Sequence, residues 1–246
     1  LLGQNVNAYD NTGYRLSDLI LNIEKLSEIK RVRYTTSHPK DMTEDLIEVY
    51  KTSKKLMPLV HLPVQSGSNN ILKEMNRKHT IEEYIELVKK LKTVNSQIKF
   101  SSDFIIGYPG EKEEDFENTL KLIKEIKFIN TFSFIYSPRP GTPAANLKSI
   151  SENEAKKRLI IFQKLAERIK MKYRRGLFNK ISIVLFENKI NNKNEFFGRD
   201  EYSNSVVVKS NENLKGKIRK VKILDGNQNT LYGEVSEKSI EEYFAA

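Results

Sequence analysis

The protein has 246 residues and a formal net charge of +10, and its 38% hydrophobic and 30% charged residues are typical of a globular chain that buries a core. It has no apolar run of about 18 residues and no basic segment ahead of a shorter apolar one, so we expect no membrane-spanning helix, no signal peptide and a cytoplasmic location. The absence of cysteine excludes disulfides, cysteine nucleophiles and any iron–sulfur cluster bound by the thiolates of this chain alone.

Helix and strand patterns alternate through the first 150 residues. Apolar residues at spacings of three and four predict helices over residues 17–29, 43–54, 80–94 and 112–126, the third opening with a capping box of Thr80 and Glu83. Apolar or β-branched runs predict strands over residues 31–36, 58–64, 98–106 and 128–136. Leu1 and Leu2 resemble the end of an earlier strand, so we expect part of a larger protein to precede them.

This order of elements indicates a fold class. Strands that alternate with helices are typical of βαβ units and a parallel sheet, and the pattern gives five strands in all. Right-handed crossovers make such a sheet either open or part of a barrel. We therefore predict an α/β domain over residues 1–172.

A different pattern follows. Residues 151–175 predict a long helix with a second capping box, Ser151 and Glu154. Short alternating strands come next, separated by turns rich in Asn and Gly, and they are predicted at residues 181–186, 196–198, 205–209, 217–224 and 230–235. So many strands in so short a segment indicate a small antiparallel barrel of OB-like size. We place the domain boundary near residues 170–176 and the second domain at 173–246.

Positive charge is concentrated in the second part of the chain. Residues 1–150 contain 22 Lys and Arg against 19 Asp and Glu, whereas residues 151–246 contain 20 against 13. Such a region favours a polyanionic partner, RNA or DNA, although a lysine-rich composition alone gives the same counts. A helical stripe is either a solvated face or an RNA-facing one, and it consists of Lys164, Arg168, Lys172 and Arg175.

Polar and glycine residues lie within or just after the carboxyl-terminal parts of the predicted parallel strands, and the fourth strand itself contains Asp103. Parallel α/β folds bind ligands at the carboxyl ends of their strands, so these residues form a candidate site. The candidates are Gln4, Asn5, His61, Gln65, Ser66, Asp103, Gly107, Ser137, Arg139 and Thr142. The three histidines of the chain are 23 and 18 residues apart, which matches no common metal motif, and we predict no metal ligand.

Each candidate also has a plain structural interpretation. A histidine inside an apolar run, such as His61, is often a hydrogen-bonded core residue, and Asp103 could serve only as a partner to a neighbouring strand. Gly67 and Gly107 could mark tight turns that need glycine, with an adjacent serine as a helix cap. Arg139 lies between two prolines, and an arginine held so rigidly more often contacts an anion than solvent.

Six stretches, taken in order, resemble one enzyme family. They are residues 1–7 (LLGQNVN), 34–39 (YTTSHP), 61–68 (HLPVQSGS), 75–80 (MNRKHT), 102–111 (SDFIIGYPGE) and 134–144 (FIYSPRPGTPA). As a set they are similar to the radical S-adenosylmethionine methylthiotransferases. The tail, with Gly198, Arg199 and residues 204–208, resembles the TRAM domain of that family, so the resemblance covers essentially the whole chain.

The resemblance implies a fold and a reaction. The fold is a partial (β/α) barrel, open on one side, followed by a small β-barrel that binds tRNA. Residues 35–39 and 137–144 look most like the branch that inserts sulfur at C2 of an isopentenyl-modified adenosine next to the anticodon of tRNA and then methylates it. S-adenosylmethionine and two 4Fe-4S clusters take part in that reaction.

The resemblance also implies roles for the first candidates. Gln4 and Asn5 correspond to a region near the amino-acid part of S-adenosylmethionine. The polar groups of His61, Gln65 and Ser66 correspond to positions that reach its ribose or methionine part.

The remaining candidates follow the last two strands. Asp103 and Gly107 correspond to positions near the ribose and adenine of S-adenosylmethionine. The mouth of the last strand, where substrate and sulfur meet, is lined by Ser137, Arg139 and Thr142. In the basic second part, contacts to tRNA phosphates that position the RNA without reading its sequence are expected from Arg174, Arg175 and Arg199.

One departure from the family is decisive. The family has an N-terminal domain with three cluster cysteines and a C-x-x-x-C-x-x-C loop, whereas this sequence starts beyond that loop and has no cysteine. Without thiolates neither cluster is held, so we expect this polypeptide to be inert unless the missing segment is supplied. The alternatives are a non-catalytic tRNA-binding remnant, and methylthiolation of a different tRNA adenosine or of a ribosomal protein.

Overall fold

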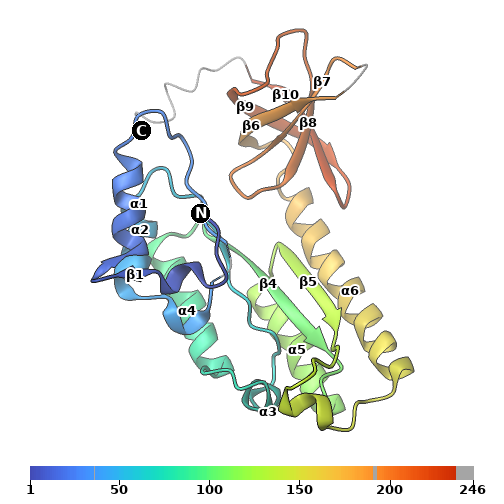
Figure 1. Ribbon diagram of the computed structural model, residues 1–246. Coiled ribbons are helices and arrows are strands. Elements are labelled where there is room, and N and C mark those ends of the chain that lie inside the picture. Colours follow the sequence, from blue (N-terminus) through green and yellow to red (C-terminus); the bar gives the residue numbers. More distant parts are fainter. Residues whose placement is uncertain (36, 191–192, 237–246) are drawn as a thin grey trace. The chain divides into compact units, whose positions relative to one another are not determined.

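A computed structural model describes residues 1–35, 37–190 and 193–236 of the chain. It divides into two compact units, which we call the N-terminal unit (Leu1–Ile169) and the C-terminal unit (Lys170–Ala246). The division falls inside one long helix, α6 (Glu152–Arg175) (Figure 1). Each unit has a hydrophobic core of its own.

The N-terminal unit alternates helices with short strands. Its helices, besides the first part of α6, are α1 (Leu16–Glu24), α2 (Glu44–Thr52), α3 (Asn69–Glu74), α4 (Ile81–Val94) and α5 (Glu113–Ile126). Its strands are β1 (Asp10–Asn11), β2 (Tyr14–Arg15), β3 (Leu59–His61), β4 (Lys99–Ile106) and β5 (Asn130–Ile135). Turns of 3₁₀ helix lie at Val6–Ala8, Pro39–Asp41 and Pro143–Asn146.

Strands β3, β4 and β5 form a parallel sheet in that order. Alternate residues of β4 point to opposite faces, and on one face Phe100 and Phe104 are buried. The ring of Phe104 lies 4.8 Å from that of Phe162 on α6 and 5.6 Å from that of Phe128. The core of the unit therefore lies on this face, between the sheet and helices α4, α5 and α6 (Figure 1).

The prediction of five parallel strands is wrong, because within the described residues the sheet has three. Leu1 and Leu2 lie outside any strand, and the amine of Leu1 donates to the carbonyl of Arg33 at 2.6 Å. In the predicted strand 31–36, of which residue 36 lies outside the described residues, Val32 forms an isolated parallel bridge with Leu56. Single contacts of this kind hold the segments beside the sheet without a ladder of consecutive hydrogen bonds.

Strand β3 is shorter than the predicted 58–64. Pro58 and Pro63 flank the strand. Pro58 has no N–H to donate to β4, and after Pro63 the backbone amide of Val64 donates to the hydroxyl of Ser102 at 3.0 Å instead of to a backbone carbonyl. Beyond the second proline the amide of Gln65 donates to the carbonyl of Asp103 at 3.0 Å, and the carbonyl of Gln65 accepts from the amide of Ile105 at 2.9 Å. The chain thus returns to the edge of β4 just past the end of β3.

The helix predictions are confirmed more closely than the strands. The capping box of α4 forms as predicted, since Thr80 Oγ1 accepts from the amide of Glu83 at 3.2 Å and Glu83 Oε2 from the amide of Thr80 at 2.7 Å. Helix α1 ends at Glu24 instead of residue 29. Its predicted apolar stripe fails there because Leu26 is 52% exposed and contributes nothing to the core.

The C-terminal unit is a closed five-stranded barrel. Its strands are β6 (Ile181–Lys189), β7 (Glu195–Arg199), β8 (Ser205–Lys209), β9 (Ile218–Gly226) and β10 (Thr230–Val235), and their order around the barrel is β10-β8-β7-β6-β9. The prediction of an antiparallel barrel is wrong at one seam, where β8 and β10 run parallel. Five strands in a closed ring cannot alternate in direction throughout, so one neighbouring pair must be parallel.

Alternating residues fill the inside of this barrel. Its buried core includes Val184, Phe186, Phe196, Val206 and Leu231, each at most 2% exposed. Within the described part of the chain, both units included, we find no helix with the length and apolar character that a bilayer crossing requires.

Candidate functional site

The face of the sheet opposite the core carries polar and aromatic side chains together. Nδ1 of His61 lies 2.9 Å from Oγ of Ser101, and Nε2 lies 3.5 Å from Oδ1 of Asp103. The next strand places Phe132 beside Asp103 and Phe134 beside Ile105. We call the surface made by His61, Ser101, Asp103, Phe132 and Phe134 the open face.

The aromatic residues of the open face are unusually exposed for a sheet. Phe132 is 53% and Phe134 60% exposed, and the ring of His61 lies 6.0 Å from that of Phe132 in an edge-on arrangement. Such a surface offers flat apolar rings next to hydrogen-bonding groups. That combination suits a ligand with an aromatic ring and hydroxyl or amino groups at its edge.

Arg77, between α3 and α4, adds a positive charge near this face. Burial lowers the pKa of the Arg77 guanidinium, and the carboxylate of Asp103 acts in the opposite direction. Asp103 therefore contacts the histidine ring directly and interacts with the guanidinium through its charge. The motif 75–80 contained Arg77, but nothing in its spacing pointed to Asp103.

The loop after β3 separates two candidates that are adjacent in the sequence. Gln65 has a left-handed backbone, with φ of 75°, and stays beside β4. Ser66 is 1% exposed, and its hydroxyl lies 3.5 Å from Oγ1 of Thr119 on α5. The amide of Gly67 donates to the same hydroxyl at 2.9 Å, and a Cβ on Gly67 would lie 2.4 Å from Cα of Thr119. Ser66 and Gly67 thus hold the loop against α5 and do not reach the open face.

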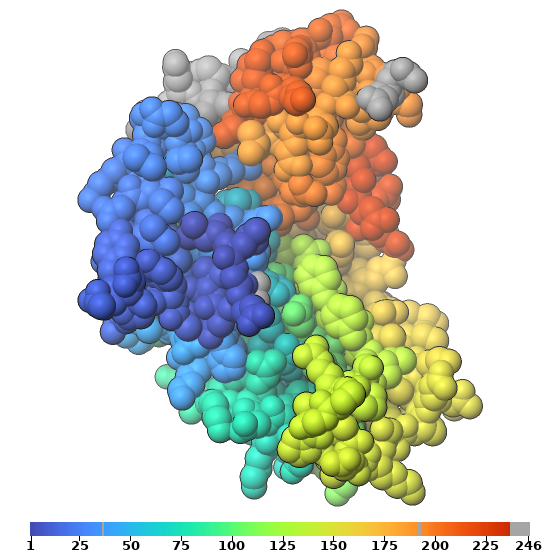
Figure 2. All heavy atoms as spheres, in the orientation of Figure 1, coloured from blue at the N-terminus to red at the C-terminus, as the bar shows by residue number. Residues whose placement is uncertain are grey.

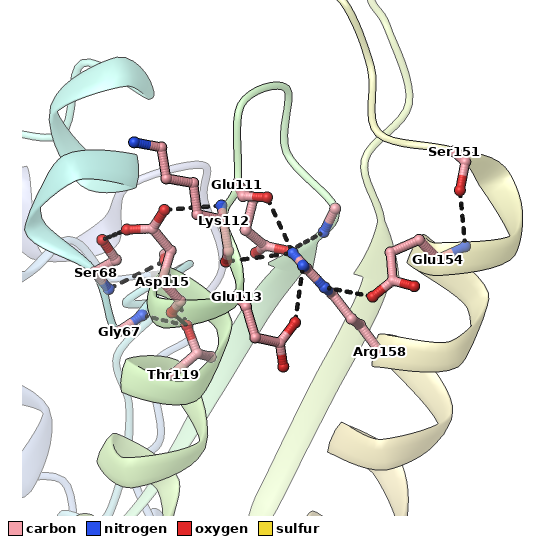
Figure 3. Close-up of polar contacts among 12 residues, drawn as sticks. Gly67, Ser68, Glu111, Lys112, Glu113, Asp115, Thr119, Ser151, Glu154 and Arg158 are labelled. Atoms are coloured by element: carbon pink, nitrogen blue, oxygen red, sulfur yellow. Dashed lines mark hydrogen bonds and ion pairs between the residues drawn. The ribbon is translucent and has the colours of Figure 1, made fainter.

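The loop after β4 turns at Gly107. Its φ is +74°, and a Cβ there would lie 2.9 Å from Cβ of Ala155 on α6, so glycine is required both by the backbone and by the space. The amide of Gly107 donates to Oε2 of Glu111 at 3.0 Å, and Arg158 on α6 donates to that same carboxylate at 2.9 Å (Figure 3). This loop is therefore fixed at the carboxyl end of the central strand.

The other rim candidates lie on exposed segments. After β5, Ser137 and Arg139 are exposed, and Thr142 closes a turn by donating from its hydroxyl to the carbonyl of Arg139 at 2.8 Å. Figure 2 shows this stretch, in yellow-green, on the surface of the N-terminal unit. Gln4 is exposed, and the side-chain amide of Asn5 donates to the carboxylate of Asp41 at 2.6 Å. Among the described contacts, no hydrogen bond joins any of these residues to the open face.

Of the ten candidates, the structure brings His61 and Asp103 into contact, with Gln65 and Gly107 at the ends of the same two strands. Sequence reasoning missed Ser101, Phe132 and Phe134. Their signal was present, because residues two apart on a strand share a face. Once Asp103 is taken as a site residue, Ser101 follows from that period, and parallel pairing adds Phe132.

Iron–sulfur ligation does not fit this chain. The whole sequence contains no cysteine, and in the parts that the structure describes no group of three His, Cys, Asp or Glu side chains is placed to hold a metal ion. We therefore derive no chemical step through a cluster on residues of this chain.

The basic candidates of the C-terminal unit differ in exposure. Arg174 is only 3% exposed, and its guanidinium donates to the carbonyl of Asn227 at 2.6 Å, which makes it a structural residue and not a surface contact for phosphate. Arg199 lies 2.6 Å from Glu187 and 5.2 Å from the centre of the Phe197 ring, with its side chain 43% exposed. Arg175 is exposed at the end of α6.

Comparison with known proteins shows which family the chain resembles. Residues 1–123 match the radical SAM superfamily. The chain is 56% identical over 97% of its length to the tRNA-2-methylthio-N(6)-dimethylallyladenosine synthase of Pelagibacter ubique, and 46% identical over 96% to the enzyme of the same name from Ehrlichia canis. It spans 54% and 55% of these two proteins, so it covers about half the length of the curated relatives that it matches.

Among solved structures, the fold is similar to that of coproporphyrinogen III oxidase from Escherichia coli, a radical SAM enzyme. The TM-score is 0.52 at 13% identity, over 78% of this chain and 52% of that one. At such low identity the likeness supports the fold and says nothing about the substrate.

Proposed function

Because this chain belongs to the radical SAM superfamily, we propose that it is the part of a tRNA methylthiotransferase that binds S-adenosylmethionine and tRNA. The reaction would add a methylthio group at C2 of N6-dimethylallyladenosine next to the anticodon. One observation carries the proposal: relatives named for this activity are 56% and 46% identical over 97% and 96% of the chain. The match therefore extends over both units.

The N-terminal unit would bind S-adenosylmethionine at the carboxyl ends of β3 and β4. When bound, this compound supplies the methyl group and the adenosyl group of the reaction. Asp103 would accept a hydrogen bond from one of its hydroxyl or amino groups, His61 would hold that carboxylate in place, and Gly107 would turn the chain at the end of β4. The aromatic rings of the open face would exclude water from one side of a bound purine.

The C-terminal unit would bind the tRNA backbone. Arg175 and Arg199 are the candidates that the structure leaves at the surface, and Arg174 is withdrawn because it is buried. Each phosphate contact releases counterions, so affinity for RNA would fall as salt rises. Binding that did not change between 50 and 200 mM salt, a range over which about six phosphate contacts lower affinity by orders of magnitude, would count against phosphate recognition.

The activity of the polypeptide by itself is a separate matter. We propose that it does not cleave S-adenosylmethionine, because it has no thiolate to hold a cluster. The test is anaerobic incubation with iron, sulfide, a reductant and S-adenosylmethionine, followed by chromatography for 5′-deoxyadenosine. Formation of that product at more than a trace would contradict the proposal, whereas its absence together with tRNA binding would support a non-catalytic tRNA-binding function for this chain.

The nucleoside specificity is tested with RNA. We expect an anticodon stem-loop that carries the dimethylallyl group to compete for the protein better than the same RNA without it. Equal competition would direct attention to another tRNA adenosine, and failure of both RNAs to bind would favour a protein substrate such as a ribosomal protein.

A further inference from the structure

One buried arginine joins α6 to the loop after β4. The side chain of Arg158 is 8% exposed and contacts three carboxylates: Glu111 at 2.9 Å, Glu113 at 3.0 Å and Glu154 at 3.1 Å. It also donates to the backbone carbonyl of Glu111 at 3.0 Å (Figure 3). A guanidinium has five donors in a fixed plane, and lysine cannot reproduce such a set of contacts.

Glu111 passes this contact on to the strand end. One of its carboxylate oxygens, Oε2, accepts from Arg158 and also from the backbone amide of Gly107, at 3.0 Å. The backbone amide of Glu111 donates to the carbonyl of Tyr108 at 2.9 Å. The turn is therefore closed by one backbone hydrogen bond and by one hydrogen bond to a side chain. The orientation of the Gly107 peptide therefore depends on where Arg158 holds Glu111.

Helix α6 contacts the same glycine a second time. Ala155, one turn before Arg158, forms the wall that a Cβ on Gly107 would meet at 2.9 Å. The helix thus supplies both the steric limit and the charge that fix this turn. In the sequence, Ala155 and Arg158 stood out only as parts of a charged amphipathic helix.

Burial and hydrogen bonding together favour a single orientation of the Glu111 carboxylate. Glu111 is 4% exposed, and burial raises the pKa of its carboxyl above the ordinary value, while the hydrogen bonds from Arg158 and Gly107 oppose that shift. Removal of the arginine alone would leave a buried carboxylate without a charged partner, which is far less stable than loss of both partners. The loop would move to bring Glu111 to water, and Gly107 would lose its acceptor.

The segment held by Arg158 and Glu111 is also bonded to the neighbouring loop. The amide of Lys112, next to Glu111, donates to Oδ2 of Asp115 at 2.9 Å, while Oδ1 of Asp115 accepts from the hydroxyl of Ser68 at 2.5 Å (Figure 3). The loops after β3 and β4 are therefore linked through the first turn of α5. A shift of Glu111 would therefore displace the chain at the ends of both β3 and β4.

We propose that Arg158 is a positioning residue for S-adenosylmethionine: it fixes Glu111, and through Glu111 the backbone of Gly107, in the orientation in which the ligand's adenosyl group meets the end of β4. This inference rests on the proposed function and assigns to α6 a role in ligand binding. Arg158 itself contacts protein groups, and it acts on the ligand only through the loop.

The test compares four variants with the wild-type chain: Arg158→Met, Arg158→Lys, the double variant Arg158→Met with Glu111→Gln, and the control Glu113→Gln. Glu113 contacts the same guanidinium, but its side chain is 66% exposed and it does not bond Gly107. Hydrogen exchange measures the amides of Gly107 and Glu111, calorimetry measures affinity for S-adenosylmethionine, and thermal unfolding measures stability.

We expect Arg158→Met to speed exchange at Gly107 about tenfold or more and to weaken affinity about tenfold, with Arg158→Lys in between and the control near wild type. The double variant recovers stability because no buried charge is left alone, yet its affinity stays low. Recovery of affinity together with stability would show that the role is only structural and would overturn the proposal.

The design also separates this proposal from the one on which it rests. If the wild-type chain binds no S-adenosylmethionine, the proposed function fails in its ligand, and the Gly107 exchange rates decide the positioning claim alone. Exchange at Gly107 that does not change in Arg158→Met, or that rises equally along all of β4 and β5, would overturn it.

Discussion

The sheet of the N-terminal unit and the barrel of the C-terminal unit bury their apolar residues differently. In the barrel every strand has two neighbours, and the inward side chains of all five strands meet in one core. In the sheet one face packs against helices, while the open face leaves Phe132 and Phe134 more than half exposed. Large exposed aromatic groups beside paired polar groups are typical of a binding surface. The inside of the barrel therefore serves stability, whereas the sheet has one face for stability and one that we propose for the ligand.

The largest expected effect is in the barrel core. Phe186 is completely buried, and we expect Phe186→Ala to destabilise the C-terminal unit by about 3–5 kcal/mol, because the removed ring leaves a cavity. Phe132→Ala on the open face should cost less than about 0.5 kcal/mol. Urea unfolding followed by circular dichroism measures both. Equal losses would mean that the open face is packed as tightly as the barrel core.

The second prediction concerns a buried histidine between α3 and α4. His79 is 8% exposed, and its ring lies 5.6 Å from that of His38. Burial lowers the pKa of His79 from 6.5 to about 4; the positive charges of His38 and Arg77 add to this, and Glu83 opposes it. The folded state thus favours the neutral ring, so the stabilisation is complete above pH 6.5 and is lost as the pH falls towards 4.

The expected size follows from the shift. Between pH 6.5 and 4 the N-terminal unit should lose about 3 kcal/mol through this residue, and His79→Phe should remove that part of the pH dependence. Unfolding free energies at half-unit pH steps give the two curves. If the variant and the wild-type protein keep parallel curves over this range, His79 does not carry the effect.

Sequence reasoning worked where local patterns decide the structure. The helices α4 and α5 and all five barrel strands follow from periodicity and capping, because these signals lie within one element. His61 was found because it ends β3, in line with the rule that ligands gather at strand ends, whereas Asp103 lies within β4. Three-dimensional contact decided the rest, and no spacing in the chain announces a contact such as that between Glu111 and Arg158.

The errors have the same origin. Arg174 stands in a basic run, and only the fold shows that it is turned inward onto the carbonyl of Asn227. Ser66 lies among rim residues, and only the approach of α5 shows that its hydroxyl is used there. The parallel seam between β8 and β10 follows from closure of the ring, which a pattern of separate strands does not reveal.

The third prediction tests the open face directly. Asp103→Asn keeps the size of the side chain and removes its charge, so we expect about a tenfold loss of affinity for S-adenosylmethionine with little change in stability. The matched control is Asp10→Asn, since Asp10 is half-exposed and pairs with Arg15 away from the sheet. Calorimetry measures the affinity and thermal unfolding measures the stability, so the two together separate an effect on binding from an effect on folding. A variant that loses stability but keeps its affinity would reassign Asp103 to a structural role.

The smallest expected effect is on RNA binding by the outside of the C-terminal unit. We expect it only for the exposed arginines and not for the buried one. Arg175→Gln and Arg199→Gln should each weaken RNA binding by a few-fold and reduce the slope of log affinity against log salt by about one. Arg174→Gln should destabilise the barrel instead, because it leaves the carbonyl of Asn227 without its donor. Fluorescence anisotropy with a stem-loop RNA at several salt concentrations gives the slopes. If Arg174→Gln, still folded, lowered the slope as much as the two exposed substitutions do, then burial would not predict which arginines contact phosphate, and the division between a closed inside and a binding outside would fail for this barrel.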